Sequence, residues 1–555
     1  MEGLVPCDAN YVPLSPISFL ERASFVYGDK LSTIYGNTKY SWREMHERCI
    51  KLASALSQLG ISRRDMVGAI APNIPALNEL HFVVPMVGAI LSTFNTKLSP
   101  TILALHLEQL EPKLIFVDSA LISLVLDSLS LISVVKSKPS IIVLLQERHA
   151  GLETLNLIKQ EASLKNVLTY DSLMEMGHAN FKIVHPKDEN EPIAVNFTSG
   201  STGRPKGVVY SHRAAYLSTI AQIFRFEMGK MSVFLWTVDM FRCNGWCFPW
   251  TMAASGGTNI FLRDDITGKS IMDAVFLYKV TNFCGAPIIL KKIADVIDVG
   301  MDKLPHSVSI MVAGTMPPPE VQEKLEALGF RIDCGYGMTE ALGIVISKPW
   351  KSPEDIHNDQ GNEEEKMVSA REGIHNLMVE GVDVKDPETM ESVPNDGETI
   401  GEIMVRSNTL MLGYLKNSQA TQDVFEGGWY RTRDLGVRLK NGEIELKDRA
   451  IDMIKVDGKS VSTLEVEGVI IRHPMVLEAA VVGKPHINLG EVPFALLKLK
   501  EGSSVTPEEI MEFCSIHLPS HMNPYYVIFG DLPVNSTGKI QKFTLREKAR
   551  ALQSR

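Results

Sequence analysis

Uniformly apolar runs alternate with helix-like segments along the first part of the chain. Residues 66–70 and 114–117 are apolar throughout, which predicts two buried strands. Before the first run, Ser41-Trp-Arg-Glu44 forms a capping box, and the apolar spacing after it predicts an amphipathic helix that ends at Gly60. A second helix is predicted from Pro100 to Leu110. Because helices alternate with strands, the pattern predicts an α/β fold with parallel sheets.

The pattern changes in the last third of the chain. Residues 351–366 are polar and acidic, which indicates a surface segment and not a domain boundary, since apolar alternation resumes near residue 377. Turn-rich, strand-like segments follow, among them 401–406 and 441–446, and they predict a β-rich region. A further unit begins after Asp448-Arg449.

Composition narrows the function classes. The chain has 555 residues, which favours several packed units, and 56 basic against 66 acidic residues give a net charge of −10. This balance argues against a nucleic-acid partner or an anionic membrane surface. The seven cysteines are scattered and odd in number, so we expect neither a disulfide framework nor a zinc cluster.

Targeting features favour the cytoplasm. No segment reaches the roughly 18 apolar residues that a membrane span needs, so we expect none. The start of the chain lacks the basic and apolar regions of a signal peptide. The last three residues, Gln553-Ser-Arg555, resemble an incomplete peroxisomal ending, which keeps the peroxisome as the alternative. For the oligomeric state we expect a monomer or a homodimer.

The most informative segment is a run rich in glycine and hydroxyl side chains. It reads Thr198-Ser-Gly-Ser-Thr-Gly-Arg-Pro-Lys-Gly207 and follows an apolar run. Backbone N–H and hydroxyl donors there can surround an anion, and Lys206 adds a positive charge, which suits a triphosphate. The run is not a Walker loop, because Lys206 precedes Gly instead of Ser or Thr. A plain Ser/Gly turn is the alternative.

Three later segments carry further candidate chemistry. Cys334-Gly-Tyr-Gly-Met-Thr-Glu340 sets an aromatic ring between glycines before a hydroxyl and a carboxylate, and it lacks the third glycine of a dinucleotide loop. In Gly428-Trp-Tyr-Arg-Thr-Arg-Asp434, the final carboxylate can accept both hydrogen bonds from a ribose diol. Near the end, Lys539 lies in Asn535-Ser-Thr-Gly-Lys-Ile540. Taken alone, Asp434 and Lys539 would be ordinary surface residues.

In this order, the segments resemble the signatures of the adenylate-forming superfamily, which includes acyl-CoA synthetases, luciferases and peptide-synthetase adenylation domains. Within it, 71–76, 241–247 and 284–287 resemble the plant acyl-activating enzymes most. The similarity runs from about residue 10 to 546. It implies a large N-terminal AMP-binding domain of stacked α/β sheets with a β-rich subdomain (1–447), a hinge (448–452) and a small, mobile α+β C-terminal domain (453–555).

The resemblance also implies a role for each candidate site residue. Tyr336 is expected to stack on adenine, Thr339 to meet the α-phosphate and Glu340 to bind magnesium. Lys206, Thr339, Glu340 and Lys539 form the implied catalytic set. The implied ATP-binding set is Thr198, Ser199, Gly200, Ser201, Thr202, Gly203, Lys206, Gly314, Tyr336, Thr339, Asp434, Arg449 and Lys539. The implied acyl and CoA pocket contains Arg242, Trp246, Gly285, Gly335 and Lys455.

The function implied is that of a carboxylic acid:CoA ligase that uses ATP, Mg²⁺ and CoA. A carboxylate is a poor acyl donor, and an acyl-adenylate supplies AMP as a good leaving group. Catalysis of this kind is mostly positioning and charge neutralisation by lysine, metal and backbone donors. In the family the C-terminal domain then rotates and admits the CoA thiol. We expect a short- or medium-chain aliphatic, or a small aromatic, acid as substrate.

Several positions depart from the family pattern. They are Asp239 for Pro, Arg242 for His, Arg433 for Gly, Ile451 for Lys, and 456–460 for a Gly-Gly-Glu-Asn turn. These departures affect mainly the thioester step. Two alternatives therefore stay open: a poorly active nucleotide- or acyl-binding paralogue that acts through a partner enzyme, and an adenylate-forming enzyme with an acceptor other than CoA.

Overall fold

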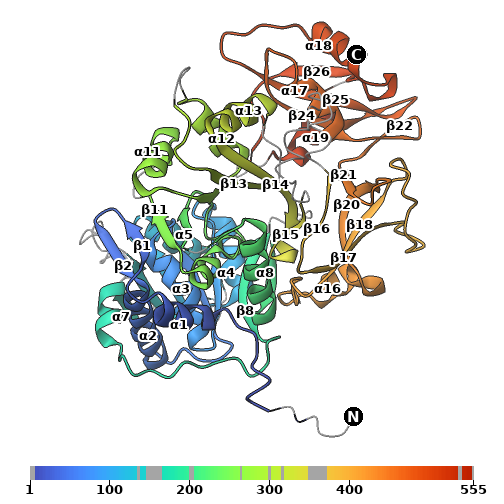
Figure 1. The fold of residues 1–555 in the computed structure, drawn as a ribbon. Helices are drawn as coiled ribbons and strands as arrows, with labels where there is room; N and C mark the ends of the chain where they lie inside the picture. Colours follow the sequence, from blue (N-terminus) through green and yellow to red (C-terminus); the bar gives the residue numbers. More distant parts are fainter. Residues whose placement is uncertain are drawn as a thin grey trace. The chain divides into compact units, whose positions relative to one another are not determined.

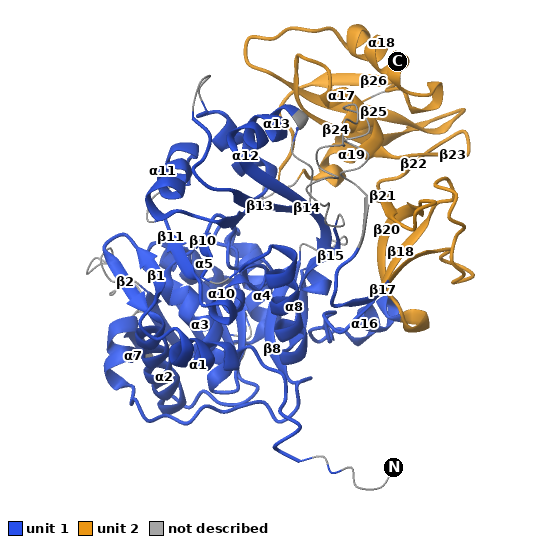
Figure 2. Ribbon diagram, viewed as in Figure 1, with its two compact units in different colours: residues 1–348, 375–381, 406–425 blue, residues 349–374, 382–405, 426–555 orange. Residues whose placement is uncertain are grey.

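The computed structural model describes residues 5, 7–133, 138–145, 166–198, 205–229, 231–262, 266–297, 302–313, 318–347, 372–534 and 540–552. The chain divides into two compact units (Figure 2). Unit 1 comprises residues 1–348, 375–381 and 406–425, and unit 2 comprises 349–374, 382–405 and 426–555. Strands β16 (Glu372–His375) and β17 (Val379–Lys385) each begin in one unit and end in the other.

An eight-stranded sheet forms the first layer of unit 1 (Figure 1). Its order is β19-β9-β8-β4-β3-β5-β6-β7. The run from β8 to β7 is parallel, and β9 pairs antiparallel with β8. Both β5 and β6 are buried at every position, as expected for a sheet with helices on both faces. The strands are β3 (Met66–Ile70), β4 (Ile90–Thr93), β5 (Leu114–Asp118), β6 (Ile141–Leu145), β7 (Asn166–Thr169), β8 (Pro192–Thr198), β9 (Lys206–Ser211) and β19 (Gly413–Tyr414).

A second sheet of unit 1 runs in the order β15-β14-β13-β12-β10-β11-β1-β2. It is parallel from β14 to β1, while β15 and β2 pair antiparallel with β14 and β1. Helices α11 (Gly268–Tyr278), α12 (Pro287–Ala294) and α13 (Pro319–Leu328) lie beside it (Figure 1). Their apolar side chains join those of its strands in one buried cluster. The strands are β1 (Leu31–Tyr35), β2 (Thr38–Ser41), β10 (Val233–Leu235), β11 (Thr258–Phe261), β12 (Asn282–Cys284), β13 (Val308–Ala313), β14 (Phe330–Met338) and β15 (Gly343–Ser347).

The α-helices described in unit 1 cover these sheets. They are α1 (Ile17–Val26), α2 (Trp42–Gln58), α3 (Pro75–Met86), α4 (Pro100–Leu110), α5 (Ile122–Leu131), α7 (Tyr170–Met176), α8 (His212–Arg225), α9 (Cys243–Trp246), α10 (Phe248–Ser255), α11 (Gly268–Tyr278), α12 (Pro287–Ala294), α13 (Pro319–Leu328) and α16 (Ser418–Val424). In the described part of the chain, no helix has the length and apolarity to cross a bilayer.

Unit 2 combines an antiparallel β-rich part with a small α+β part. In the first, β18 (Gly401–Ser407), β20 (Tyr430–Arg438) and β21 (Ile444–Arg449) are neighbours. The second has the order β23-β22-β25-β24, with β26 paired to β25. Its elements are β22 (Ile454–Val456), β23 (Lys459–Val461), β24 (Val476–His486), β25 (Gly490–Leu499), β26 (Tyr526–Phe529), α17 (Thr463–Ile471), α18 (Pro507–His517) and α19 (Lys542–Ala551).

Strand β24 explains how the small α+β part is layered. Its alternate residues Ala479 and Val481 join the core formed with α17 and α18, whereas Ala480 and Val482 join the core formed with α19. Because successive side chains of a strand point to opposite faces, helices cover both faces of this sheet. The near-continuous apolar run in the sequence reflects that double burial.

The fold class predicted from the sequence is confirmed, and so are several individual elements. Ser41 caps α2 in a capping box with Glu44, and the two predicted strands are β3 and β5. The helix predicted from Pro100 to Leu110 is α4. The strand expected at 441–446 begins only at Ile444. The acidic segment 351–366 lies outside the described residues, and the domain boundaries stay a prediction.

Candidate functional site

Four segments far apart in the sequence meet around Thr339 and Glu340 in unit 1. These two residues follow β14 and open a 3₁₀ turn. The Tyr210 hydroxyl donates to the Thr339 carbonyl oxygen at 2.7 Å, and the Cys243 thiol lies 3.4 Å from Thr339 Oγ1. The Tyr414 hydroxyl donates to Glu340 Oε1 at 2.9 Å. The backbone and side chain of this turn are therefore fixed mostly by neutral donors.

Tyr414 also links this turn to the phosphate segment. Lys206 Nζ lies 4.7 Å from the centre of the Tyr414 ring, a cation–π contact. Lys206 begins β9 and faces Thr198, the last residue of β8, in the antiparallel register. Five predicted residues of the connecting loop, Ser199, Gly200, Ser201, Thr202 and Gly203, lie outside the described residues. The structure thus places Thr198, Lys206, Thr339 and Glu340 on neighbouring segments of unit 1.

Tyr414 and Tyr210 are the residues that sequence reasoning missed. Neither lies in the glycine- and hydroxyl-rich segment that we identified. Tyr210 is fully buried, and burial raises the pKa of its hydroxyl well above the usual value, so the hydroxyl stays a donor. A tyrosine after a glycine gives no local signal, because its partners come from other elements.

The region assigned to the acyl group is built on an unusual backbone. Residues 243–247 all have a left-handed φ, between 46° and 68°. Such a conformation costs about 1–2 kcal/mol for each residue other than glycine. It turns Cys243 toward Thr339, and the Cys247 thiol lies 3.8 Å from the Leu342 carbonyl oxygen. Burial raises the pKa of the Cys243 thiol to about 11, so this cysteine is no nucleophile at neutral pH.

Two of the departures from the family pattern form a pair with each other. Arg242 Nε lies 3.1 Å from Asp239 Oδ2. The Arg242 guanidinium also lies 5.5 Å from the centre of the Phe241 ring. The charge that replaces a histidine is thus balanced locally by the charge that replaces a proline. Trp246, also predicted here, is half-buried.

Close packing explains why two of the predicted pocket residues are glycines. A Cβ at Gly335 would lie 2.7 Å from Ile344 Cδ1, and one at Gly285 would lie 3.0 Å from the Ile289 Cβ. Tyr336 lies opposite Ile346 between β14 and β15. Gly314, predicted on the adenine side, lies outside the described residues.

In unit 2, the structure brings Asp434 and Arg449 together. They face each other in the register of β20 and β21, and Arg449 Nε lies 3.7 Å from Asp434 Oδ1. The Arg449 side chain is 55% exposed and the Asp434 side chain 17%. Arg433, which replaces a glycine of the family, has a left-handed φ of 61°. The position therefore has the backbone conformation that glycine favours.

The turn that departs from the family pattern at 456–460 is a tight hairpin. Asp457 and Gly458 connect β22 to β23 with φ values of 47° and 76°. Asp-Gly is a preferred pair for such a two-residue turn. Lys455 is exposed, and its Nζ lies 2.5 Å from Ser460 Oγ across the hairpin.

Lys539 lies outside the described residues, but the helix that follows it is well anchored. Lys542 Nζ lies 2.8 Å from Glu467 Oε1 and 2.5 Å from Thr463 Oγ1. One turn later, Arg546 pairs with Asp452, the last residue of the predicted hinge. Helix α19 is thus tied by charge both to α17 and to the hinge segment.

A magnesium ion fits the donors of unit 1. Glu340 offers one carboxylate, and Mg²⁺ in nucleotide sites is held by one or two carboxylates together with substrate phosphates. A site built from protein ligands alone is not expected here. The described residues contain no group of three or more His, Cys, Asp or Glu that could hold a metal.

Comparisons with known proteins extend these observations. The model of the AMP-binding enzyme family matches residues 20–415, and the model of the AMP-binding enzyme C-terminal domain matches residues 465–539. Among solved structures, the anthranilate CoA ligase AuaEII in complex with anthranoyl-AMP is similar with a TM-score of 0.80. The similarity covers 98% of this chain and 99% of that chain at 22% identity, and it supports the fold.

Three curated relatives match over nearly their whole length. Probable acyl-activating enzyme 21 of Arabidopsis thaliana is 45% identical, with 99% of this chain and 98% of the relative covered. A 2-methylpropanoate–CoA ligase of Humulus lupulus is 40% identical, with 100% and 98% covered. A butyrate–CoA ligase of Arabidopsis thaliana, named as peroxisomal, is 40% identical, with 100% and 96% covered. Both the family models and these identities show that the chain belongs to the AMP-binding enzyme family.

Proposed function

We propose that the chain is an AMP-forming carboxylic acid:CoA ligase for a short- or medium-chain aliphatic, or small aromatic, acid. A carboxylate oxygen attacks the α-phosphorus of ATP, pyrophosphate leaves, and the CoA thiolate then attacks the acyl carbon and releases AMP. The observation that carries the proposal is the meeting of Thr339, Glu340 and Lys206 around Tyr414. The relatives named as ligases of 2-methylpropanoate and butyrate support an acid of this size.

In unit 1 we assign three charged or polar groups to the phosphates. The Thr339 hydroxyl, fixed beside Cys243, donates to an α-phosphate oxygen. Lys206 attracts the phosphate chain, aided by the backbone donors of the glycine-rich run. Glu340, oriented by Tyr414, would hold Mg²⁺, which supplies charge neutralisation for the phosphates.

In unit 2 we assign the residues that bind the ribose and the lysine that neutralises charge during the first step. Asp434 accepts hydrogen bonds from the ribose hydroxyls, and Arg449 contacts the ribose or a phosphate. Lys539 neutralises the charge that develops as the carboxylate attacks, and Lys455 acts in the thioester step. The anchoring of α19 by Lys542 and Arg546 supports this assignment, because α19 begins three residues after Lys539.

The paired Arg242 and Asp239 indicate which acids to expect. Arg242 lies in the region assigned to the acyl group, and its positive charge is paired with Asp239. It is therefore less available to bind a second carboxylate of the substrate. An apolar tail or ring suits this region better than a second carboxylate would. We therefore expect monocarboxylic acids to react faster than dicarboxylic acids of equal length.

A pyrophosphate-release screen tests the proposal. About thirty acids, aliphatic and aromatic, are offered with ATP and Mg²⁺, each with and without CoA. We expect pyrophosphate from a few monocarboxylic acids, and AMP and thioester in equal amounts when CoA is added. Absence of acid-dependent pyrophosphate exchange across the whole panel would defeat the proposal.

A second candidate function keeps the adenylate but changes the acceptor. It is favoured by the hairpin at 456–460 and by Ile451, which is 63% exposed, since both replace family residues of the thioester step. Substituting amines or alcohols for CoA in the same assay decides between the two. Faster AMP release with an amine than with CoA would establish this second candidate.

The compartment can be tested separately. The sequence favours the cytoplasm, while a relative named as peroxisomal supports the alternative. A fluorescent protein fused before residue 1, expressed in plant cells beside a peroxisomal marker, distinguishes the two.

A further inference from the structure

Asp434 lies at the end of a β-bulge in strand β20 of unit 2. In the pairing of β18 with β20, Glu402 faces Leu435 and Met404 faces Arg431. Three residues of β20, 432–434, therefore lie opposite the single residue between them on β18. Bulges of this kind redirect side chains and occur often beside active sites.

The bulge is closed by hydrogen bonds of its own backbone and hydroxyl groups. Thr432 Oγ1 donates to the Ile403 carbonyl oxygen at 2.6 Å and accepts from the Asp434 N–H at 3.0 Å. The Arg433 carbonyl oxygen accepts from the Ala450 N–H at 2.9 Å. These bonds fix the two ends of the bulge, but the left-handed Arg433 at its centre costs conformational energy.

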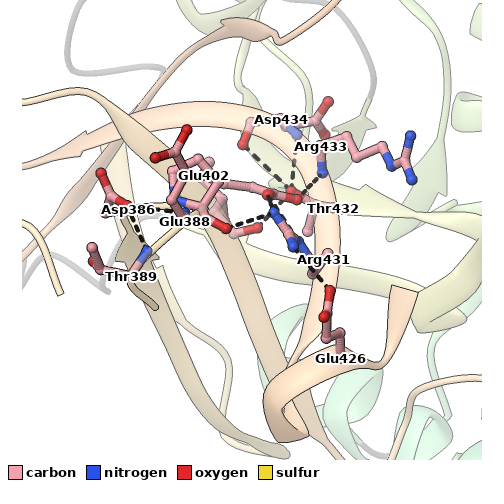
Figure 3. A network of polar contacts seen from close by, with 11 residues as sticks. Asp386, Glu388, Thr389, Glu402, Glu426, Arg431, Thr432, Arg433 and Asp434 are labelled. Atoms are coloured by element: carbon pink, nitrogen blue, oxygen red, sulfur yellow. Dashed lines mark hydrogen bonds and ion pairs between the residues drawn. The ribbon is translucent and has the colours of Figure 1, made fainter. Parts of the chain in front are cut away.

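The buried carboxylate of Glu402 offsets the conformational cost of Arg433 by binding its backbone N–H (Figure 3). Glu402 Oε1 accepts the Arg433 backbone N–H at 2.9 Å. Its other oxygen, Oε2, accepts from Arg431 at 2.9 Å and 3.2 Å, so the guanidinium makes two bonds to one acceptor. The Glu402 side chain is only 6% exposed. A buried charge needs such a partner, because an unpaired carboxylate there would be strongly unfavourable.

Arg431 is in turn held on two further sides. Its guanidinium lies 3.3 Å from Glu426 Oε2 and donates to the Pro387 carbonyl oxygen at 3.2 Å. Asp386, next to that proline, accepts the Glu388 and Thr389 N–H groups (Figure 3). Arg431 and Glu402 therefore connect the turn at 386–389 to the backbone of the bulge.

We propose that Glu402 and Arg431 are positioning residues that hold the 432–434 bulge in the shape with which Asp434 selects ribose over deoxyribose. The inference rests on the proposed nucleotide role of Asp434. Glu402 binds the N–H directly before Asp434 and reaches no ligand through its own buried oxygens. Loss of its charge lets the strained Arg433 relax toward extended backbone, which moves the carboxylate that follows it.

The test compares ATP with 2′-deoxy-ATP in the pyrophosphate-release assay. Glu402→Gln keeps the volume and removes the charge, and Arg431→Met removes the partner. We expect the ratio of kcat/KM for ATP to that for 2′-deoxy-ATP to fall about tenfold in both variants, as when a charge-assisted hydrogen bond is lost. The KM for the acid should stay unchanged, and Arg431→Lys should recover part of the ratio.

Arg438→Met is the matched control. Arg438 ends the same strand, four residues after Asp434, and forms an ion pair with Asp383 at 3.2 Å. This variant should lose a similar amount of thermal stability and keep the wild-type ratio. An unchanged ratio in soluble Glu402→Gln, or an equal fall in Arg438→Met, would overturn the positioning role.

Asp434→Asn separates this inference from the proposed function. If it abolishes the preference for ATP while Glu402→Gln preserves it, only the positioning role is wrong. If Asp434→Asn keeps the wild-type preference, the ribose role of Asp434 fails, and the positioning role fails with it.

Discussion

Unit 1 and unit 2 hold their candidate site residues by different kinds of interaction. In unit 1, the hydroxyl groups of Tyr210 and Tyr414 bind the turn at Thr339 and Glu340. In unit 2, ion pairs do the corresponding work: Glu402 with Arg431, and Glu467 with Lys542. A neutral hydrogen bond contributes modestly to folding stability, and a conservative change of one partner costs little. Removing one partner of a buried ion pair costs more, because the other charge is left buried and unpaired.

Two buried histidines make unit 1 sensitive to acid. His81 and His106 lie in unit 1, and burial lowers their pKa values to about 4 and about 3. Both are thus neutral in the folded chain at neutral pH. Unit 1 should accordingly lose stability as these histidines become protonated in acid.

The largest effect is expected from Lys542→Met, which leaves Glu467 buried without its cation. We expect a loss of about 3–5 kcal/mol in the free energy of unfolding, measured by urea titration. Lys498→Met is the control, since Lys498 pairs with an Asp531 that is 86% exposed, and exposed pairs contribute little. Adding Glu467→Gln to Lys542→Met should restore most of the loss. Equal losses in the two lysine variants would contradict the cost assigned to breaking a buried ion pair.

Lys539→Ala should reduce adenylation by about 100- to 1,000-fold, the range seen when a group that stabilises transition-state charge is removed. Thioester formation from a preformed acyl-adenylate and CoA should stay near the wild-type rate. Pyrophosphate exchange and thioester release measure the two steps. Lys548→Ala, at an exposed position of α19, serves as the control. A parallel fall of both steps would show that Lys539 has no specific role in the first.

Acidification should destabilise unit 1 through His106. Its folded pKa is about 3 and its ordinary value is 6.5, so between these values the unfolded chain binds more protons. Stability is therefore complete above pH 6.5 and falls as the pH drops toward 3, by about 1.4 kcal/mol per pH unit. Trp42, Trp236 and Trp250 are buried in unit 1, and their fluorescence reports its unfolding. In His106→Phe, the decline between pH 6.5 and 5 should be about 2 kcal/mol smaller. An unchanged slope would exclude His106 as the source.

Tyr414→Phe tests the neutral side of the comparison. It removes the hydroxyl bond to Glu340 and keeps the ring beside Lys206. We expect kcat to fall about five- to tenfold, in line with about 1 kcal/mol for one hydrogen bond. Tyr414→Ala removes the ring as well and should cost more. If the two variants behave alike, the hydroxyl contributes nothing.

The smallest effect concerns the strained Arg433. Arg433→Gly should be about 1 kcal/mol more stable than Arg433→Ala, because only glycine adopts a left-handed φ without a steric cost. Thermal unfolding of the two variants measures the difference. A more stable alanine variant would show that the backbone is extended in solution.

Much of this architecture could be predicted from local signals. The capping box of α2, the apolar strands β3 and β5, and the helix beginning at Pro100 follow from side-chain spacing alone. The glycine-rich run was identified because glycine and hydroxyl residues cluster there, whereas the Asp434 segment was identified through its resemblance to a family signature. Such patterns can be recognised in the sequence because helix caps and backbone sterics depend on residues only a few positions apart.

Tertiary structure alone decided which distant residues serve the site. Tyr414 reaches Glu340 across 74 positions, and Glu402 reaches the Arg433 N–H across 31. The physical reason is that hydrogen bonds and ion pairs depend on distances of about 3 Å in space. Only sheet register and the packing of helices bring those atoms within reach.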